Sequence, residues 1–306
     1  MATNQTYTGA GSIGRRENLL DLIAYADQRE FMLVPTLPRA ETHNTYVEWQ
    51  TDTYAAGATT NSAVEGAAIT FATASPRTRV GNYTQLMDKQ VTISSTVRAT
   101  LIAGIDDEFT EQLRKRTVEI AKDAEVSILR STSATGASNA ARTMSGLGEA
   151  ISSEASSATA NRDWTRVLHN PFVQGIWENG GNPDLILTKA AGAFDFADFA
   201  VDAQGGALKV NVNANGRIPD VVRYFEDQLG VRRIVASIFV STATATATVG
   251  MYFIDTAELK LAELIPLHFE AAAKVGHSTD GFLEWELSLV WGAESKHGKV
   301  QGLSNS

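Results

Sequence analysis

Alternating hydrophobic and polar positions predict several β-strands along the chain. The clearest case is residues 283–291, where leucine or tryptophan occupies every second position and mostly polar residues lie between them. This period of two is typical of a strand with one buried face. Residues 91–99 alternate in the same way, and aromatic and β-branched residues predict a strand over 46–50. Further strands are predicted over 184–188, 221–225, 231–240, 251–254 and 259–265, and the Thr–Ala alternation of 242–248 suits a strand or a hairpin tip.

One long amphipathic helix is predicted over residues 105–130. Its apolar stripe, with members mostly four or seven positions apart, consists of Ile105, Phe109, Leu113, Ile120, Ala124 and Ile128. Acids at positions 106–108 suit the positive end of the helix dipole, and Arg130 suits the other end. At 1.5 Å per residue this helix is about 39 Å long. Shorter helices are predicted over 16–28, 189–199 and 163–179, and Pro171 favours a kink or an interruption in the last of these.

Residues 39–76 have a different composition, with little apolar bulk. After the strand at 46–50 the chain is small and polar, and residues 67–72 are expected to return as the partner strand. Two arms of about 16 residues would reach roughly 50 Å. A compact chain of this length has a radius of gyration of only about 19 Å. Such a hairpin cannot build its own core, so it must fold back or lie on another molecule.

Composition then narrows the class of protein. The chain of 306 residues is 43% hydrophobic and 20% charged, which is ordinary globular composition. Its net charge of −9 disfavours tight, sequence-independent binding to nucleic acid, which depends on Lys and Arg. The absence of cysteine excludes disulfides, thiol catalysis and Cys-based metal sites. No apolar run is long enough for a membrane span, and the polar N-terminus does not have the pattern of a signal peptide, so we expect a soluble protein.

Motifs that carry chemistry are few and weak. Residues 9–14 match G-x-G-x-x-G, but no buried strand precedes them, so a flexible arm is the better interpretation. Residues 276–280 begin like a nucleophile elbow around Ser278 but lack its closing glycine, which favours a turn. The five histidines are scattered and no H-E-x-x-H occurs. We therefore expect no catalytic residues, no cofactor and no metal site.

Several segments occur in an order that is similar to one known family. They are residues 15–23 (RRENLLDLI), 46–53 (YVEWQTDT), 61–67 (NSAVEGA), 79–85 (RVGNYTQ), 180–187 (GGNPDLIL) and the hairpin of 224–235. The chain resembles the major capsid proteins of tailed bacteriophages with the Hong Kong 97-type fold, over about residues 7–300. The Ala–Thr tract at 242–248 and the loop at 203–216 depart from the family pattern.

The resemblance implies an α+β fold with four parts. An N-terminal arm is expected over residues 1–40 and an extended β-hairpin loop over 41–85. A peripheral domain, with a long spine helix and a sheet, is expected over 86–183 and 266–306. An axial domain is expected over 184–265. The amphipathic helix of 105–130 would then be the spine helix, and residues 39–76 would belong to the loop that lies on a neighbouring subunit.

The implied function is structural rather than enzymatic. The subunit would assemble through pentamers and hexamers into the icosahedral shell around the double-stranded DNA genome of a tailed bacteriophage. Expected partners are further copies of the chain, the portal, a scaffold and decoration proteins, with no membrane and no sequence-specific DNA binding. The expected location is the virion capsid, assembled in the host cytoplasm. Alternatives are an encapsulin-type nanocompartment, a tail or decoration protein, and a hydrolase that uses His277 and Ser278.

The same resemblance points to residues for contacts between subunits. They are Tyr46, Glu48, Trp49, Arg77 and Arg79, all in or beside the expected loop. Trp49 is expected to be an anchor on the adjacent subunit, and the alternative is that it packs on its own chain at the base of the hairpin. Some family members form Lys–Asn crosslinks between subunits. Residues 39–76 contain no lysine, so no such crosslink is expected.

Overall fold

The computed structural model describes residues 31–304, apart from positions 67, 70, 72–73, 75, 101–105, 159–160, 199–222, 241–247 and 275. The N-terminal arm with its predicted helix, the glycine motif at 9–14, the loop at 203–216 and nearly all of the tract at 242–248 lie outside the described residues. None of the described helices is long and apolar enough to cross a membrane.

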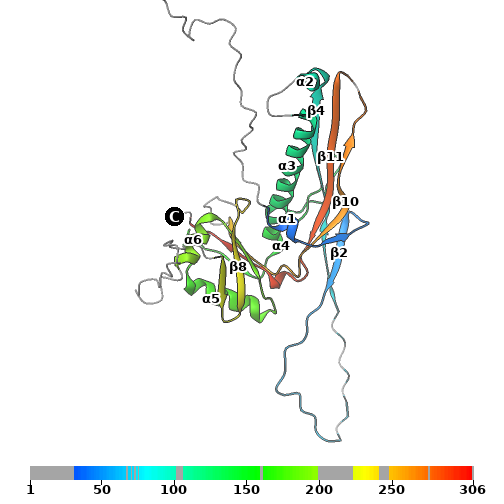
Figure 1. The fold of residues 1–306 in the computed structure, drawn as a ribbon. Helices are drawn as coiled ribbons and strands as arrows, with labels where there is room; N and C mark the ends of the chain where they lie inside the picture. The colour runs from blue at the N-terminus through cyan, green and yellow to red at the C-terminus, as the bar shows by residue number, and fades with distance from the viewer. Residues whose placement is uncertain are drawn as a thin grey trace, which may run out of the picture.

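A four-stranded sheet forms the upper part of the molecule in Figure 1. Its order is β1 (Arg39–Glu41), β10 (Lys260–Ala271), β11 (Ser278–Val290) and β4 (Gln85–Ser94). β1 runs parallel to β10, and the other neighbours are antiparallel. β11 contains most of the strand predicted at 283–291, and its leucines and tryptophans are buried on one face as the alternation requires.

The strand predicted at 91–99 is only partly correct. β4 begins earlier, at Gln85, and stops at Ser94, where the short helix α2 (Ser95–Ala99) begins. The hydroxyl of Ser94 accepts a hydrogen bond from the Val97 backbone N–H at 3.3 Å, which caps this helix. Ser–Ser–Thr is a sequence that favours a helix start, and this local capping overrides the alternation of Val97 and Ala99.

The long helix α3 (Glu108–Arg130) lies alongside this sheet (Figure 1). Asp107 caps its N-terminus, because the carboxylate accepts hydrogen bonds from the backbone N–H groups of Phe109 and Thr110. Ile120, Ala124 and Ile128 of the predicted stripe are fully buried in the main core with the inward side chains of β11. Ile105 falls outside the described residues, so the described helix begins three positions later than predicted.

A six-stranded sheet forms the second part of the fold. Its order is β5 (Ala155–Ser156), β12 (Gly298–Gln301), β9 (Val249–Ile254), β6 (Leu185–Thr188), β8 (Gly230–Ala236) and β7 (Tyr224–Asp227). The helices α5 (Arg166–Glu178) and α6 (Ala190–Asp198) pack beside it (Figure 1). α5 is continuous through Pro171, so the predicted interruption does not occur. Trp164, Phe196 and Phe253 lie in a second apolar cluster here.

Each of the two sheets joins distant segments of the chain. β5 and β12 pair within the six-stranded sheet, and α5 packs in its apolar cluster. All of β10, including residues 260–265, belongs to the four-stranded sheet. Because strands from distant parts of the sequence pair with each other, neither sheet corresponds to one continuous stretch of the chain. The remaining short helices are α1 (Leu33–Thr36), α4 (Leu147–Ala150) and η2 (Glu294–Lys296).

Candidate functional site

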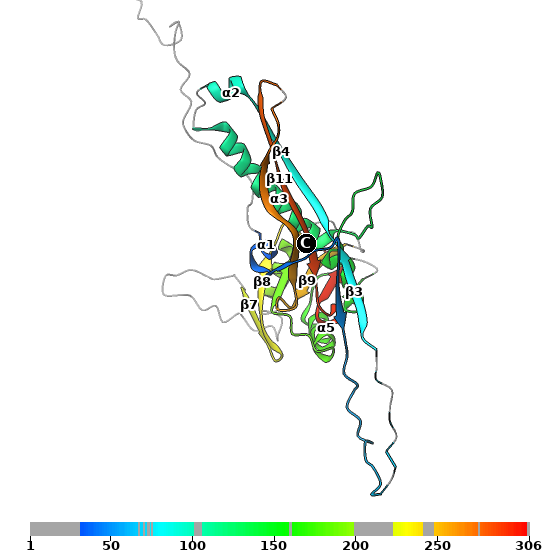
Figure 2. The ribbon, with the colours of Figure 1, turned by 90° about the vertical axis from the view of Figure 1, so that its right-hand side faces the viewer.

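The most distinctive surface of the molecule is a long projecting hairpin. Its stem is a two-stranded ladder in which β2 (Tyr46–Thr51) pairs with β3 (Thr78–Tyr83), from Tyr46 opposite Tyr83 to Thr51 opposite Thr78. The described residues of 52–77 continue beyond this ladder and extend away from the body (Figures 1 and 2). We call residues 52–77 the hairpin tip.

The predicted return strand of this hairpin is wrong. Residues 67–72 are predicted to pair with 46–50, but the partner of β2 is β3, and the described positions of 67–72 lie in no strand.

Within the stem, the Tyr46 ring lies directly over Gly81. A Cβ on Gly81 would come within 2.6 Å of the Tyr46 ring. Glycine at this position therefore allows the close approach that the stem needs.

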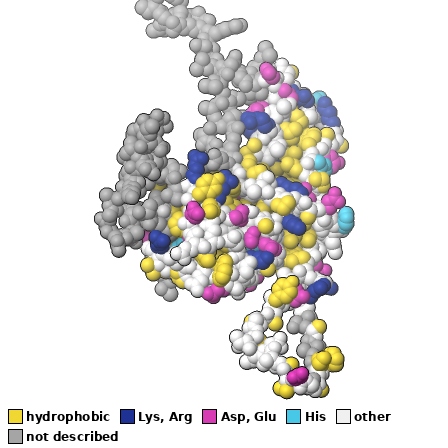
Figure 3. All heavy atoms as spheres, turned by 60° about the horizontal axis from the view of Figure 1, so that its bottom comes forward, with side chains coloured by type: hydrophobic (Ala, Val, Ile, Leu, Met, Phe, Trp, Pro, Cys, Tyr) yellow, Lys and Arg dark blue, Asp and Glu magenta, His cyan; other side chains and the backbone are white. Residues whose placement is uncertain are grey.

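The hairpin tip exposes large apolar side chains that contact little of their own chain. Tyr54 is 104% exposed, Phe71 91%, Ile69 82% and Val64 79%. Hydrophobic side chains on this projecting part are visible in Figure 3, which views the molecule with the bottom of Figure 1 brought forward. Four large apolar side chains exposed on one short projecting segment are more than the scattered single hydrophobic residues of an ordinary surface, and they favour an interaction site. The tip therefore has the chemistry of a segment that is covered by another molecule.

Trp49 contacts its own chain, which is the alternative left open by the sequence. Its indole N–H donates a hydrogen bond to the Gly292 carbonyl oxygen at 2.8 Å. Its ring packs edge-on against Trp291 with 4.9 Å between the ring centroids. Trp49 and the cross-strand residue Val80 are half-buried against the main core. Trp49 thus anchors the stem to the body of its own subunit at the base of the hairpin.

The other predicted contact residues lie on the stem and its continuation. Arg79 forms an ion pair with Glu48 at 3.6 Å, and Arg77 forms one with Asp52 at 3.5 Å. The two arginine side chains remain 69% and 67% exposed. Exposed ion pairs contribute at most about 1 kcal/mol to stability, so both arginines are available to a partner at little cost. The ring of Tyr46 packs against that of Tyr83 across the stem, with 4.6 Å between centroids.

Asn82 is a key residue of the stem that the sequence analysis did not single out. Its amide N–H groups donate to the carbonyl oxygens of Ser145 (3.0 Å) and Leu289 (2.8 Å), and its oxygen accepts from the Ser145 backbone N–H (2.8 Å). The side chain is buried, so these three bonds fix the stem to β11 and to the chain before α4. The only sequence signal for this role is the presence of an asparagine in a short segment of mixed polarity, which does not indicate burial.

The candidate catalytic residues do not form a catalytic arrangement. The Ser278 hydroxyl donates a hydrogen bond to Asp280 at 2.8 Å and lies at the start of β11, opposite Ser94. Its neighbour His277 is exposed. Within the described part of the chain, therefore, Ser278 is not hydrogen-bonded to a histidine that could act as its base.

His297 has a structural role. Its ring nitrogens contact the Asp255 backbone N–H and the Trp291 carbonyl oxygen, and burial lowers its pKa.

Comparisons with known proteins agree with this geometry. Among solved structures, the chain is similar to proteins of Mycobacterium phage Cain (15% identity, TM-score 0.60, covering 95% of this chain and 96% of that chain) and Microbacterium phage Oxtober96 (10%, 0.62, 94% and 95%). It is also similar to an encapsulin of Synechococcus elongatus PCC 7942 (9%, 0.56, 92% and 93%). At these identities the likeness shows the fold.

Family membership comes from the sequence itself. Curated proteins give no match. The family of the SU10 major capsid protein matches residues 2–304, which is nearly the whole chain. The predicted α+β capsid fold and the predicted structural, non-enzymatic role are therefore confirmed. The chain belongs to the SU10 major capsid protein family of tailed bacteriophages, with the Hong Kong 97-type fold.

Proposed function

We propose that this capsid protein assembles through pentamers and hexamers into an icosahedral shell that encloses double-stranded DNA. The observation that carries the proposal is the hairpin tip, with Tyr54, Val64, Ile69 and Phe71 exposed beyond an anchored stem. A stem fixed to the core can hold such a tip in a defined direction. A second copy of the chain is the occupant available at every position of a shell, and burying four large side chains would stabilise each contact by several kcal/mol.

In this proposal the two sheets correspond to the two domains of the family. The four-stranded sheet with α3 would be the peripheral domain, and the six-stranded sheet with α5 and α6 would be the axial domain. Glu48 and Arg79 on the stem and Arg77 at the end of the tip would contact the neighbouring subunit, and Tyr46 and Trp49 would hold the stem. The absence of lysine from 39–76 supports a shell that is held without covalent Lys–Asn links.

The net charge of −9 supports an enclosing rather than a binding role toward DNA. An acidic wall repels phosphate, so it can surround a dense genome without holding it in place. Portal, scaffold and decoration proteins would be the further partners, and assembly would take place in the host cytoplasm. An encapsulin-type compartment shares the fold, but the family match favours the phage capsid.

Deletion of residues 53–73 tests the proposal directly. Because the exposed tip adds little to the core, the deleted subunit should keep native circular dichroism and its unfolding midpoint. Closed shells should be absent from electron micrographs. Loss of native circular dichroism would mean that the tip packs within its own chain, and normal shells from the deletion would overturn the proposal.

A milder variant separates the apolar contacts from the length of the loop. Replacing Tyr54, Val64, Ile69 and Phe71 with serine keeps the backbone and should also prevent closed shells. The matched control changes four neighbouring polar residues, Thr59, Thr60, Asn61 and Ser62, to alanine. The control should still assemble. Equal defects in both variants would show that the apolar side chains are not what the neighbour recognises.

A further inference from the structure

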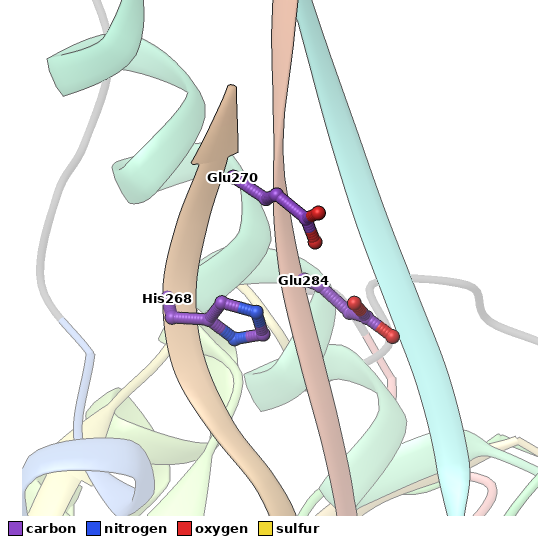
Figure 4. A group of neighbouring side chains, drawn as sticks. All are labelled: His268, Glu270 and Glu284. Carbon is purple, nitrogen blue, oxygen red and sulfur yellow. The ribbon is translucent and has the colours of Figure 1, made fainter. Parts of the chain in front are cut away.

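A group of ionisable side chains lies on the face of the four-stranded sheet that α3 does not cover. Leu283 and Trp285 of β11 point into the core beneath α3, so Glu284 between them points to the opposite face. His268 of β10 is directly opposite Glu284 in the strand register, and Glu270 follows two residues later on the same side of β10. Figure 4 shows these three side chains projecting from the two adjacent strands.

The three side chains have the chemistry and spacing of metal ligands. Each offers one ligand atom, and the three atoms lie within 4.8 Å of one another. Ligand atoms around zinc lie about 2.0–2.2 Å from the metal, so modest side-chain rotations would bring all three into contact with one ion. His268 and Glu270 are exposed and Glu284 is half-buried, so the ends of these side chains have room to move. Two paired strands within a sheet also hold their Cα atoms in fixed positions.

The hydrogen bond made by the His268 ring also suits metal binding. Its Nδ1 lies 3.0 Å from the Pro266 carbonyl oxygen. A carbonyl oxygen only accepts hydrogen bonds, so Nδ1 carries the proton and the lone pair is on Nε2. Metal-binding histidines commonly use this arrangement, in which a hydrogen bond to one nitrogen fixes the ring and leaves the other nitrogen free to bind.

A further carboxylate lies beside this cluster. Asp88 of β4 is directly opposite Glu284, so acids occupy adjacent positions across two strands. Elsewhere on this sheet carboxylates are paired: Glu263 with Arg39 and Glu286 with Arg142. Among the described residues, no Lys or Arg forms an ion pair with Asp88, Glu270 or Glu284. Like charges across neighbouring strands destabilise a sheet, and a bound cation would remove this cost.

We propose that His268, Glu270 and Glu284 bind one divalent transition-metal ion, of which zinc is the representative. An imidazole nitrogen among the ligands favours zinc, copper or nickel over calcium and magnesium, which prefer oxygen ligands alone. Water would fill the remaining positions, and Asp88 would add to the negative potential at the site. This site would stabilise the pairing of β10 with β11 and does not depend on how the shell assembles.

Equilibrium dialysis of the metal-stripped full chain against ZnCl2 tests the proposal. The expected result is one bound zinc per chain. His268→Gln, and separately the double variant Glu270→Gln with Glu284→Gln, should weaken zinc binding by about tenfold or more. The control is His277→Gln, which removes an exposed histidine near the end of the same strand pair and should leave binding unchanged.

Three outcomes would count against the proposal. Stoichiometric zinc binding that persists in His268→Gln and in the double glutamate variant would place the ion elsewhere. No zinc binding by the native chain would leave the cluster as an ordinary acidic surface. A parallel dialysis against CaCl2 tests the imidazole ligand: calcium binding as tight as zinc, and unaffected by His268→Gln, would contradict its role. Circular dichroism of each variant confirms that the chain is folded in every comparison.

Discussion

At the scale of single residues, Trp49 shows how an interior contact can be hidden in a polar hairpin. Its sequence neighbours are polar and give no indication of a core position. The side chain is nevertheless held by Gly292 and Trp291, more than two hundred positions away in the chain. A tryptophan that satisfies its N–H and packs on another aromatic ring contributes both dispersion and a hydrogen bond to stability.

We predict that Trp49→Ala destabilises the isolated subunit by about 2–3 kcal/mol, less than the cost for a fully buried tryptophan. Trp49→Phe should cost about 1 kcal/mol, because the ring contact is largely kept and the hydrogen bond is lost. Urea unfolding of dissociated subunits measures both. Tyr54→Ala is the control, since Tyr54 is fully exposed and should change particle yield without changing unfolding. Native unfolding of Trp49→Ala would contradict the anchoring role.

At the scale of elements, the chain before β1 is fastened to the long helix by one carboxylate. Glu125 of α3 is fully buried. Its oxygens accept hydrogen bonds from the backbone N–H groups of Met32 (3.0 Å), Leu33 (2.9 and 3.1 Å) and Val34 (2.8 Å). These are N–H groups at the start of α1, which have no partner within that helix. α1 and α3 are therefore joined through the two oxygens of one side chain, each of which accepts two backbone N–H hydrogen bonds.

Glu125→Gln should lower the free energy of unfolding by about 2–4 kcal/mol, because an amide NH2 group replaces an oxygen that accepts two of these bonds and then faces backbone N–H donors. Glu119→Gln is the matched control on the same helix. Glu119 pairs with Arg116 at the surface, and its loss should cost less than about 1 kcal/mol. Guanidinium unfolding of the two variants measures the difference. Equal midpoints would show that the bonds to α1 add nothing to stability.

Elements with a strong local pattern were predictable, and their pairings were not. α3 and β11 follow from periodicity, because each has a buried face that its own sequence displays. β6 follows from a short apolar run, and all four of its residues are buried. The partner of β2 could not be found in this way. Residues 78–83 contain arginine, glycine and asparagine, and they form a strand because Asn82 and Val80 meet the body at β11 and the core. Such a strand is determined by tertiary contacts rather than by propensity.

For the candidate sites too, local features could be predicted from the sequence and features that depend on strand pairing could not. The exposed, coreless character of the hairpin could be predicted, since it depends only on composition along one segment. The cluster of His268, Glu270 and Glu284 could not. Its histidine and its second glutamate meet only through the register of β10 and β11, which contains shifts before His268. A one-residue change in that register would place the glutamate on the opposite face.

At the scale of the whole molecule, stability should depend on pH through a buried histidine under the six-stranded sheet. Burial, with the nearby charge of Arg232 next in effect, lowers the pKa of His169 to about 4. Its Nδ1 accepts a hydrogen bond from the Trp164 indole N–H, and Nε2 lies 3.7 Å from Asp227, which pairs with Arg232. The unfolded chain binds a proton near pH 6.5 and the folded chain only near pH 4. Stability is therefore complete above about pH 6.5 and falls as the pH decreases toward 4.

The predicted loss over this range is roughly 3 kcal/mol from His169 alone. His297, whose pKa is also lowered by burial, acts in the same direction. Urea unfolding at a series of pH values measures the slope. His169→Gln should flatten the dependence of stability on pH between pH 6.5 and 4. His43→Gln, which changes an exposed histidine, should leave that dependence unchanged. An unchanged slope in His169→Gln would contradict the assignment.

The hairpin tip has a consequence for how this protein can diverge. Its exposed side chains contribute little to the folding of their own subunit, so substitutions there escape the stability threshold that limits the core. In an assembled shell, substitutions in the tip would be limited mainly by the surface of the neighbouring subunit that the tip contacts. A change in either surface then succeeds only with a matching change in the other. Two related capsids could share nearly identical cores and still be unable to mix their subunits.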